Sequence, residues 1–212
     1  MKYQEDRMDI KQYYTGPIQV NTYLCADEDS KEAFILDPGM SCKPMDNYIE
    51  TNDYHIKYII LTHGHGDHIC GVPYYKQMFG APVVGHKDDD FLFNDARENL
   101  SVGMCGQKVE FLPDLYVKDG DELQVGNMKL KIIHTPGHSP GGIGVLIGNV
   151  LFSGDTLFAN SIGRTDFRGG SFKTLYKSVH EKYFVLPDDT YVLPGHMGVT
   201  TIGHEKQYNP FL

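Results

Sequence analysis

The sequence lacks the patterns that mark several other classes of protein. No run of about 18 apolar residues, the length that a transmembrane helix needs, occurs in the 212 residues. Lys and Arg form no cluster and the formal net charge is −9, which does not favour a nucleic-acid partner. The charged stretch 1–14 has no apolar core like that of a secretory signal. We therefore expect a cytoplasmic protein that binds neither membranes nor nucleic acid; no oligomeric state is predicted.

Cysteine is scarce and its spacing is uninformative. The four cysteines, Cys25, Cys42, Cys70 and Cys105, form no C-x-x-C pair. Two disulfides would be possible, but we expect buried thiols in a cytoplasmic chain. Cys70 follows a histidine-rich loop and could bind zinc, although that loop already holds enough donors. The G-x-S-x-G motif of serine hydrolases is also absent, so a serine nucleophile is not expected.

Strand-like and helix-like segments are mixed along the chain, and 41% apolar residues can form a sizeable core. Strands are predicted over 18–27, 32–39, 56–62, 81–85 and 190–196, with a hairpin in 120–135 and two strands in 141–155. Helices are predicted over 43–52, 69–80, 87–97, 171–186 and 201–208. The pattern predicts one domain of two βα halves, about 1–110 and 111–212, with sheets face to face and helices outside.

The first half contains an acidic run and, further on, a stretch without a clear period. The acidic run KDDD (87–90) is interpreted as a solvated helix start, and 98–108 as a loop lying over another part of the molecule. In contrast, 56–62 is almost continuously apolar, which predicts a strand buried on both faces. That strand delivers the most informative segment of the chain to the edge of a sheet.

This segment is LTHGHGDHICG (61–71), which places His63, His65, Asp67 and His68 within six positions. Gly64 and Gly66 separate the donors, and we expect them to permit unusual backbone angles that turn the donors toward one point. Any one of these histidines could be an ordinary surface residue. The combined pattern should arise by chance in well under roughly one percent of chains of this size. It therefore predicts a metal site.

Three further donors follow later strands. His138 lies in a loop fixed by proline and glycine, Asp155 follows an apolar strand, and His196 follows the last strand. Taken singly, His138 could be a turn residue and Asp155 a helix cap. Because site residues gather where strands end, we expect these three to join the first loop. The remaining histidines are interpreted as structural: His55, His86, His134, His180 and His204.

The motifs THGHGDH (62–68), HTPGHSPGG (134–142), FSGDTLF (152–158), SIGRTDF (161–167) and LPGH (193–196) resemble those of metallo-β-lactamase-fold hydrolases. Within that group the chain is similar to the short, single-domain glyoxalase II-like enzymes. The resemblance implies an α/β (α+β) fold, the four-layer αββα sandwich. It spans nearly the whole chain.

The resemblance also implies a ligand set for two divalent ions. His63, His65 and His138 would hold one ion, Asp67, His68 and His196 the other, and Asp155 would bridge them. Asp37, in LDPG, would orient a ligand imidazole, or else it is a turn residue that ends a strand. Zinc is the first expectation, with iron or manganese also suited to these donors.

The implied reaction is hydrolysis of a small-molecule thioester such as S-lactoylglutathione. Two ions about 3.5–4 Å apart lower the pKa of a shared water toward roughly 7, and the hydroxide attacks a carbonyl. Asp67 would orient that hydroxide as well as bind metal. A thiolate leaves readily, so no strong general acid is needed. Arg164 is a candidate to hold a substrate carboxylate, or it pairs with Asp166.

Several alternatives remain. The main one is a persulfide dioxygenase with a single iron at His63, His138 and Asp155, because GRTDF (163–167) and the segment 173–187 resemble that group. Lactamases and nucleases of the fold rank lower, and a non-enzymatic metal-binding protein lower still, since all seven ligand positions are filled. Longer glyoxalase II enzymes use a C-terminal helical domain to bind glutathione, whereas this sequence ends soon after His196. We therefore expect that the thiol carrier can differ.

Overall fold

The computed structural model describes residues 7–212, which form two six-stranded sheets and a small third one. The first sheet has the strand order β1-β2-β3-β4-β5-β6. The first three strands are antiparallel and the rest run parallel to β3. Its strands are β1 (Met8–Thr15), β2 (Val20–Asp27), β3 (Glu32–Leu36), β4 (His55–Ile60), β5 (Val83–His86) and β6 (Leu115–Val117).

The second sheet contains the later strands in the order β14-β13-β10-β9-β8-β7. Its strands are β7 (Glu122–Val125), β8 (Met128–His134), β9 (Ile143–Ile147), β10 (Val150–Gly154), β13 (Tyr191–Pro194) and β14 (Thr200–Thr201). The small sheet pairs β11 (Leu157–Phe158) with β12 (Ser161–Ile162).

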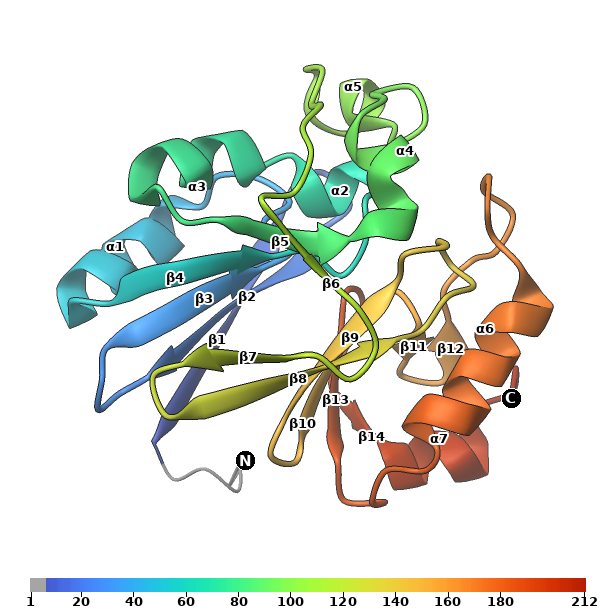
Figure 1. Cartoon of the computed structure of the whole chain (residues 1–212). Coiled ribbons are helices and arrows are strands. Elements are labelled where there is room, and N and C mark those ends of the chain that lie inside the picture. The colour runs from blue at the N-terminus through green and yellow to red at the C-terminus, as the bar shows by residue number, and fades with distance from the viewer. Residues whose placement is uncertain (1–6) are drawn as a thin grey trace.

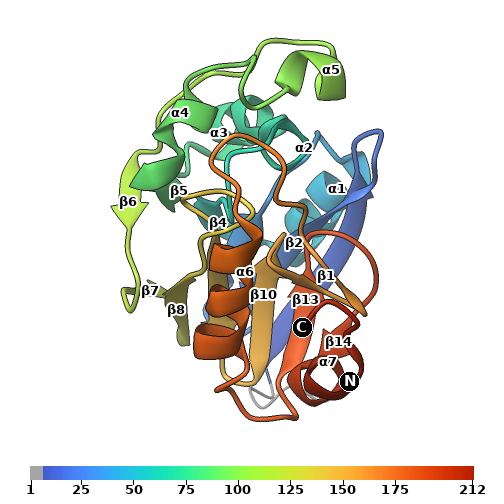
Figure 2. The same ribbon diagram turned by 90° about the vertical axis from the view of Figure 1, so that its right-hand side faces the viewer.

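The two large sheets face each other and helices cover their outer sides (Figures 1 and 2). On the first sheet these are chiefly α1 (Lys43–Asn52) and α3 (Val72–Phe79); on the second they are α6 (Phe172–Ser178), the π-helical turn Val179–Tyr183 that continues it, and α7 (Ile202–Tyr208). Shorter helices of the first half are α2 (Gly66–Ile69), the 3₁₀ turn Lys87–Asp89, α4 (Asp90–Phe93) and α5 (Ser101–Cys105). This arrangement confirms the predicted α/β class and its four αββα layers.

Side chains along the strands point alternately to the two faces of the sheet, and so they contribute to separate parts of the hydrophobic core. Tyr23 and Cys25 of β2 face the second sheet, while Leu24 and Ala26 face the helices outside the first sheet. Between the sheets, Phe152 meets Tyr23 and Phe34 edge to face, with ring centroids 5.2 and 6.0 Å apart. Such pairs add about 0.5–1.5 kcal/mol beyond burial. The two sheets therefore share one packed core, which positions the ends of their strands.

Most predicted elements are present with shifted ends. The hairpin in 120–135, the strand pair in 141–155 and the strand in 56–62 are confirmed, and Ile59, Ile60 and Leu61 are fully buried. Ser171 caps α6 as predicted, because its hydroxyl accepts a hydrogen bond from the Thr174 amide. The sequence pattern does not predict β1, whose residues mix polar and apolar types and are mostly half-exposed, and its strand is formed by pairing with β2.

The acidic run at 87–90 corrects one expectation. Lys87 and Asp88 are exposed, but Asp89 is completely buried, so the run is not a solvated helix start. The predicted helix over 87–97 also ends at Phe93. In 98–108, where a loop was expected, the chain forms the short helix α5. Burial of Asp89 has consequences for the metal-binding loops that are described below.

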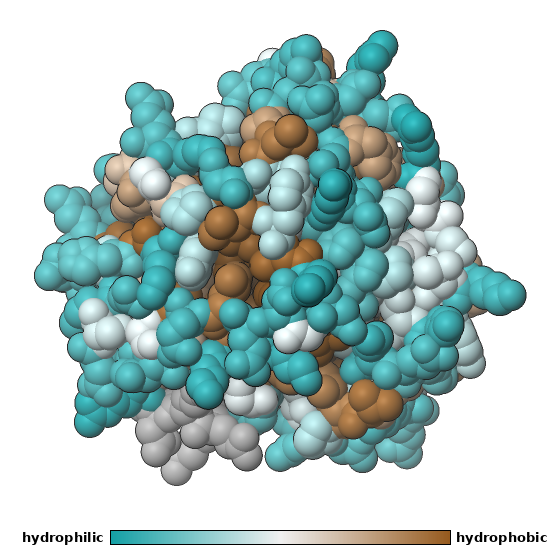
Figure 3. All heavy atoms as spheres, viewed as in Figure 1, coloured by the Kyte–Doolittle hydropathy of each residue, from teal (hydrophilic) through white to brown (hydrophobic). Residues whose placement is uncertain are grey.

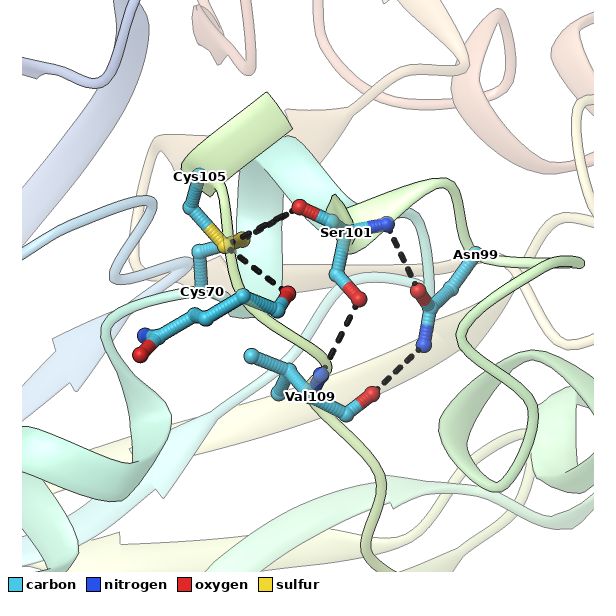
Figure 4. Close-up of a disulfide and its surroundings, with 6 residues drawn as sticks. Cys70, Asn99, Ser101, Cys105 and Val109 are labelled. Atoms are coloured by element: carbon cyan, nitrogen blue, oxygen red, sulfur yellow. Dashed lines mark hydrogen bonds between the residues drawn. A yellow bond between two sulfur atoms is a disulfide. The ribbon is translucent and has the colours of Figure 1, made fainter. Parts of the chain in front are cut away.

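The cysteines give a second correction. Cys70 at the end of α2 and Cys105 in α5 form a disulfide, which Figure 4 shows, whereas thiols were expected. Because the bonded sulfur of Cys70 is no thiolate, the alternative of Cys70 as a zinc ligand is also wrong. Cys25 and Cys42 are outside this disulfide, as expected. In residues 7–212, no helix has the length and apolar character to span a bilayer. The cytoplasmic location stays a prediction.

Candidate metal centre

All seven predicted ligand residues lie together where strands of both sheets end. β4 leads into the loop that carries His63 and His65, and α2 carries Asp67 and His68. His138 follows β8, Asp155 follows β10 and His196 follows β13. These elements are far apart in the sequence, and only the packing of the two sheets brings their ends to one place. The structure therefore supplies the meeting point that the motifs predicted.

Gly64 and Gly66 are needed for a different reason from the one expected. Neither has a positive φ. Instead, a Cβ on Gly64 would lie 2.6 Å from the Cβ of Leu92, and one on Gly66 would lie 2.7 Å from the carbonyl of Asn99. The loop thus needs glycine because neighbouring segments press against its backbone, and the expected unusual backbone angles are wrong.

The first cluster consists of three imidazoles. His138 Nε2 lies 2.9 Å from His65 Nδ1 and 3.2 Å from His63 Nε2. Ligand atoms about 2.0–2.1 Å from a common ion are separated by distances of this order, about 3 Å. The three rings are buried, and their nitrogens converge as they would around one cation.

The hydrogen bonds on the far sides of these rings fix their tautomers. His138 Nδ1 donates to the carbonyl of Arg164 at 2.7 Å. His63 Nδ1 lies 3.1 Å from the hydroxyl of Thr62, whose own proton goes to Asp37 at 2.6 Å. In a neutral imidazole only one nitrogen carries hydrogen, so the Nε2 lone pairs of His63 and His138 face each other. Such a contact is unfavourable unless a cation lies between the two nitrogens.

The second cluster combines Asp67, His68 and His196. An oxygen of Asp67 lies 3.2 Å from His196 Nε2 and 3.4 Å from His68 Nε2. His68 Nδ1 donates to Asp37 at 2.9 Å, and Asp37 also accepts from the amide and hydroxyl of Thr62. Asp37 therefore lies where the resemblance placed it, against the far side of a candidate ligand imidazole.

Asp155 lies between the two clusters. One of its oxygens is 3.4 Å from His68 Nε2, and the other is 3.7 Å from His138 Nε2 and 3.6 Å from His196 Nε2. The first oxygen and His68 Nε2 are buried without a hydrogen-bond partner among the described residues. Buried polar atoms normally have a partner, and a shared cation would satisfy both of these. The donor set therefore fits divalent ions on both sides of one carboxylate.

Titration favours the metal-binding form of most candidate ligands, but not of His68, whose pKa the carboxylates of Asp67, Asp155 and Asp37 raise well above its usual range despite burial. Burial, reinforced by the neighbouring histidines, holds the pKa of His63 well below its usual range and lowers that of His65 to about 3. Burial works against ionisation of Asp67 and Asp155, but the neighbouring histidines, His68 foremost, together outweigh it and keep the pKa of both carboxyls below the usual value. Neutral imidazoles and ionised carboxylates are the ligand forms that metals require.

Asp89, which sequence reasoning missed, ties the two histidine loops together. Its carboxylate accepts hydrogen bonds from the Gly64 amide at 3.0 Å, the Ser139 hydroxyl at 2.8 Å and the Gly141 amide at 2.6 Å. Gly64 lies between two candidate ligands and Ser139 follows His138. Burial raises the pKa of Asp89 to about 6, although these three bonds lower it. An aspartate inside an acidic run gives no sequence signal for such a role.

The candidate donors form the floor of a cavity of about 350 Å³. Five of them line it: His65, Asp67, His138, Asp155 and His196. The other lining residues come from both halves of the chain and are mainly apolar; they are Ile18, Asn99, Leu100, Met104, Phe158, Ser161, Ile162, Arg164, Phe167 and Met197. A small molecule in this cavity would reach the metal donors directly.

Arg164 lines the cavity but its charge is already paired. Its guanidinium makes two hydrogen bonds of 2.7 Å to Asp166 and lies over the Phe167 ring, 4.2 Å from the centroid. The alternative that the sequence left open, pairing with Asp166, is therefore present. The pair is exposed, so it stabilises the fold little.

A second histidine pair is unsuited to metal as arranged. His86 and His134 stack with ring centroids 4.0 Å apart and an interplanar angle of 12°, next to Asp88. A metal lies in the plane of the imidazole that binds it, and nearly parallel rings cannot share one ion in that way. The structural interpretation of these histidines therefore stands.

A family model described as the metallo-beta-lactamase superfamily matches residues 15–196, from the start of the first sheet to the last candidate ligand. The chain belongs to this superfamily. This agrees with the resemblance seen in the sequence, and with a metal-dependent enzyme whose His and Asp clusters hold divalent ions.

Similar proteins within the superfamily are named for different activities. Hydroxyacylglutathione hydrolase GloC of Haemophilus influenzae is 40% identical over 97% of this chain and 98% of its own length. Human mitochondrial persulfide dioxygenase ETHE1 is 32% identical over 90% of this chain and 70% of its own length. The crystal structure of BLEG-1 B3 metallo-beta-lactamase is 39% identical, with a TM-score of 0.89 over 96% of this chain and 99% of that one.

Proposed function

We propose that this protein is a binuclear metal-dependent hydrolase of thioesters. The observation that supports it best is the pair of buried clusters joined by Asp155, with one cluster on each side of its carboxylate. The relative named as a hydroxyacylglutathione hydrolase covers nearly all of the chain, which agrees with this choice. Zinc is the first candidate for the two ions, and iron and manganese remain alternatives.

The residues of the chain take defined parts in this proposal. His63, His65 and His138 would hold one ion, and Asp67, His68 and His196 the second. When bound, the ions supply hydroxide at neutral pH and polarise a carbonyl. Asp67 lies at the cavity floor within 3.2 Å of His196 Nε2, where its carboxylate can orient the attacking water. His138 is kept in position by the Arg164 carbonyl and His68 by Asp37.

The experiment combines turnover with metal analysis. The purified protein is loaded with zinc, iron or manganese, and thiol release from S-lactoylglutathione and other acyl thioesters is followed. We expect hydrolysis and close to two ions per chain by mass spectrometry. No turnover of any thioester by protein that holds two ions would contradict the proposal. Parallel assays with a β-lactam test for the activity named in BLEG-1 B3 metallo-beta-lactamase.

A persulfide dioxygenase with one iron is the second candidate. It is favoured by the similarity to human ETHE1 and by the grouping of His63, His138 and Asp155, which would form a triad of two histidines and one carboxylate. Oxygen consumption with glutathione persulfide, together with one iron per chain, would support this candidate over hydrolysis. The metal content and the oxygen electrode therefore separate the two activities in the same sample.

A further inference from the structure

The walls of the cavity differ in character from its floor. Seven apolar side chains form these walls: Ile18, Leu100, Met104, Phe158, Ile162, Phe167 and Met197. The carboxamide of Asn99 is already used, since it donates to the Leu92 carbonyl. It also donates to the Val109 carbonyl and accepts from the Ser101 amide (Figure 4). Apart from the metal donors, Ser161 and Arg164 are the polar groups left for a substrate. The walls thus suit apolar groups.

Two wall residues are held in an unusual backbone conformation. Leu100 has φ of +64° and Met197 has φ of +67°, a region that residues other than glycine rarely adopt. Both side chains remain partly exposed at the cavity, by 37% and 53%. Strain of this kind persists only where the surroundings enforce it, and it gathers at functional sites.

Buried asparagines supply this enforcement on both sides of the cavity. The backbone before Leu100 is held by the Asn99 carbonyl, which accepts from the Gly66 amide at 2.6 Å, and by the carboxamide described above. The backbone of Met197 is held by Asn21, whose amide group donates to the carbonyls of Met197 and Pro194 at 2.9 Å each. The fold therefore presents two apolar side chains at the cavity in fixed positions.

Outside the candidate metal ligands, the described side chains that line the cavity offer no unpaired positive charge to an anionic substrate. Among residues 7–212, Arg164 is the only lysine or arginine that lines the cavity, and Asp166 neutralises this charge. The next arginine, Arg168, donates to Glu98 at 2.8 Å. A carboxylate that bound Arg164 would have to displace Asp166 and would meet its negative charge. On the face in Figure 3, hydrophobic residues gather in groups among hydrophilic ones.

We propose that the cavity selects thioesters whose acyl and thiol parts are apolar and uncharged, in preference to glutathione esters with their two carboxylates. This inference rests on the proposed thioester hydrolysis. Leu100 and Met197 contact the substrate's apolar part and set the preference, while Arg164 is kept from binding carboxylates by Asp166. An uncharged ester loses no ionic hydration when it enters these walls.

The first test compares two esters with the same acyl group, S-butanoyl-N-acetylcysteamine and S-butanoylglutathione, on the metal-loaded protein. We expect kcat/KM to be about tenfold or more higher for the uncharged ester. Of the corresponding S-butyl thioethers, which cannot be hydrolysed, the uncharged one should bind more tightly, with the lower Kd by calorimetry. Equal values for the two members of each pair would overturn this inference alone. No hydrolysis of either ester would overturn the proposed function. The thioether measurement distinguishes the two outcomes, because it tests the binding preference without hydrolysis.

The second test changes the walls. Asparagine tolerates a left-handed backbone, so Leu100→Asn and Met197→Asn remove apolar contact without adding strain. Each should lower kcat/KM for the uncharged ester about fivefold or more through KM and leave metal content unchanged. Val185→Asn, at an exposed apolar residue away from the cavity, is the control. Unchanged KM in both wall variants would overturn the assignment of Leu100 and Met197.

The third test frees Arg164. Asp166→Asn should raise kcat/KM for the glutathione ester about threefold or more and change the uncharged ester by less than about twofold. Glu181→Gln makes the same change in net charge in another exposed ion pair, with Lys177, and should raise neither. Equal gains in both variants would show that overall charge, not Arg164, determines the preference, and would overturn this part of the inference.

Discussion

The floor and the walls of the cavity are built on different principles. The floor consists of buried imidazoles and carboxylates, of which His68 and His138 are fixed by a hydrogen bond behind the ring. The walls consist of partly exposed apolar side chains, two of them on strained backbone. The floor needs exact positions because a metal tolerates little variation in distance, whereas apolar contact depends mainly on area. The floor thus determines whether a reaction occurs, and the walls determine its substrate.

The largest effect should come from removing the group shared by both clusters. Asp155→Ala leaves His68 Nε2 and His138 Nε2 without their common carboxylate. We expect activity to fall by about a thousandfold or more and metal content to drop. Asp188→Ala, at an exposed aspartate that pairs with Lys206, is the control and should change neither. A fully active Asp155→Ala protein would refute the floor as described.

The disulfide joins the floor to the walls, because Cys70 ends α2 and Cys105 belongs to α5, next to Met104. Cys105→Ser should lower the free energy of unfolding by about 2–4 kcal/mol, as expected for a cross-link that closes a loop of this length. It should also raise KM while metal content stays the same. Cys42→Ser, outside the disulfide, is the control. A loss of metal with unchanged KM would show that the bond supports the floor instead.

Asp89 makes stability depend on pH. Its pKa is raised to about 6, so between pH 4 and 6 the native carboxyl keeps a proton that the unfolded chain has lost. Its contribution to stability therefore falls as pH rises through this window, by about 2 kcal/mol between pH 4.5 and 7.5. Asp89→Asn lacks this titrating group. In urea unfolding of the metal-free proteins, the variant's loss in free energy of unfolding relative to the wild type should therefore become smaller as pH rises. The exposed variant Asp88→Asn should run parallel to the wild type.

The last prediction in this series concerns the support behind the floor. Asp37→Asn retains the shape but places an amide against Thr62 or His68. We expect metal binding to weaken by about tenfold to a hundredfold, as for other groups behind metal ligands. Asp27→Asn, at a buried carboxylate bonded to Asn127 and Ser30, should lower stability without changing metal affinity. Equal metal affinities in the two variants would remove Asp37 from this role.

Most residues of the floor could be predicted from the sequence alone. Six positions of one loop hold four donors, and the resemblance placed His138, Asp155 and His196 beside them. It also placed Asp37 behind them. These residues can be read from the chain because a donor keeps its chemical identity whatever surrounds it, and strand ends are where such donors gather.

Only the tertiary structure decided the walls and the links between the loops. Asp89 looked like part of a solvated acidic run, Cys70 and Cys105 looked like separate thiols, and Leu100 looked like a loop residue. Each gains its role from a neighbour distant in sequence: Gly141 for Asp89, α5 for Cys70, and the Gly66 backbone for the segment before Leu100. The local sequence pattern shows which chemical groups the chain contains, whereas the burial and hydrogen bonding of those groups depend on which segments pack together.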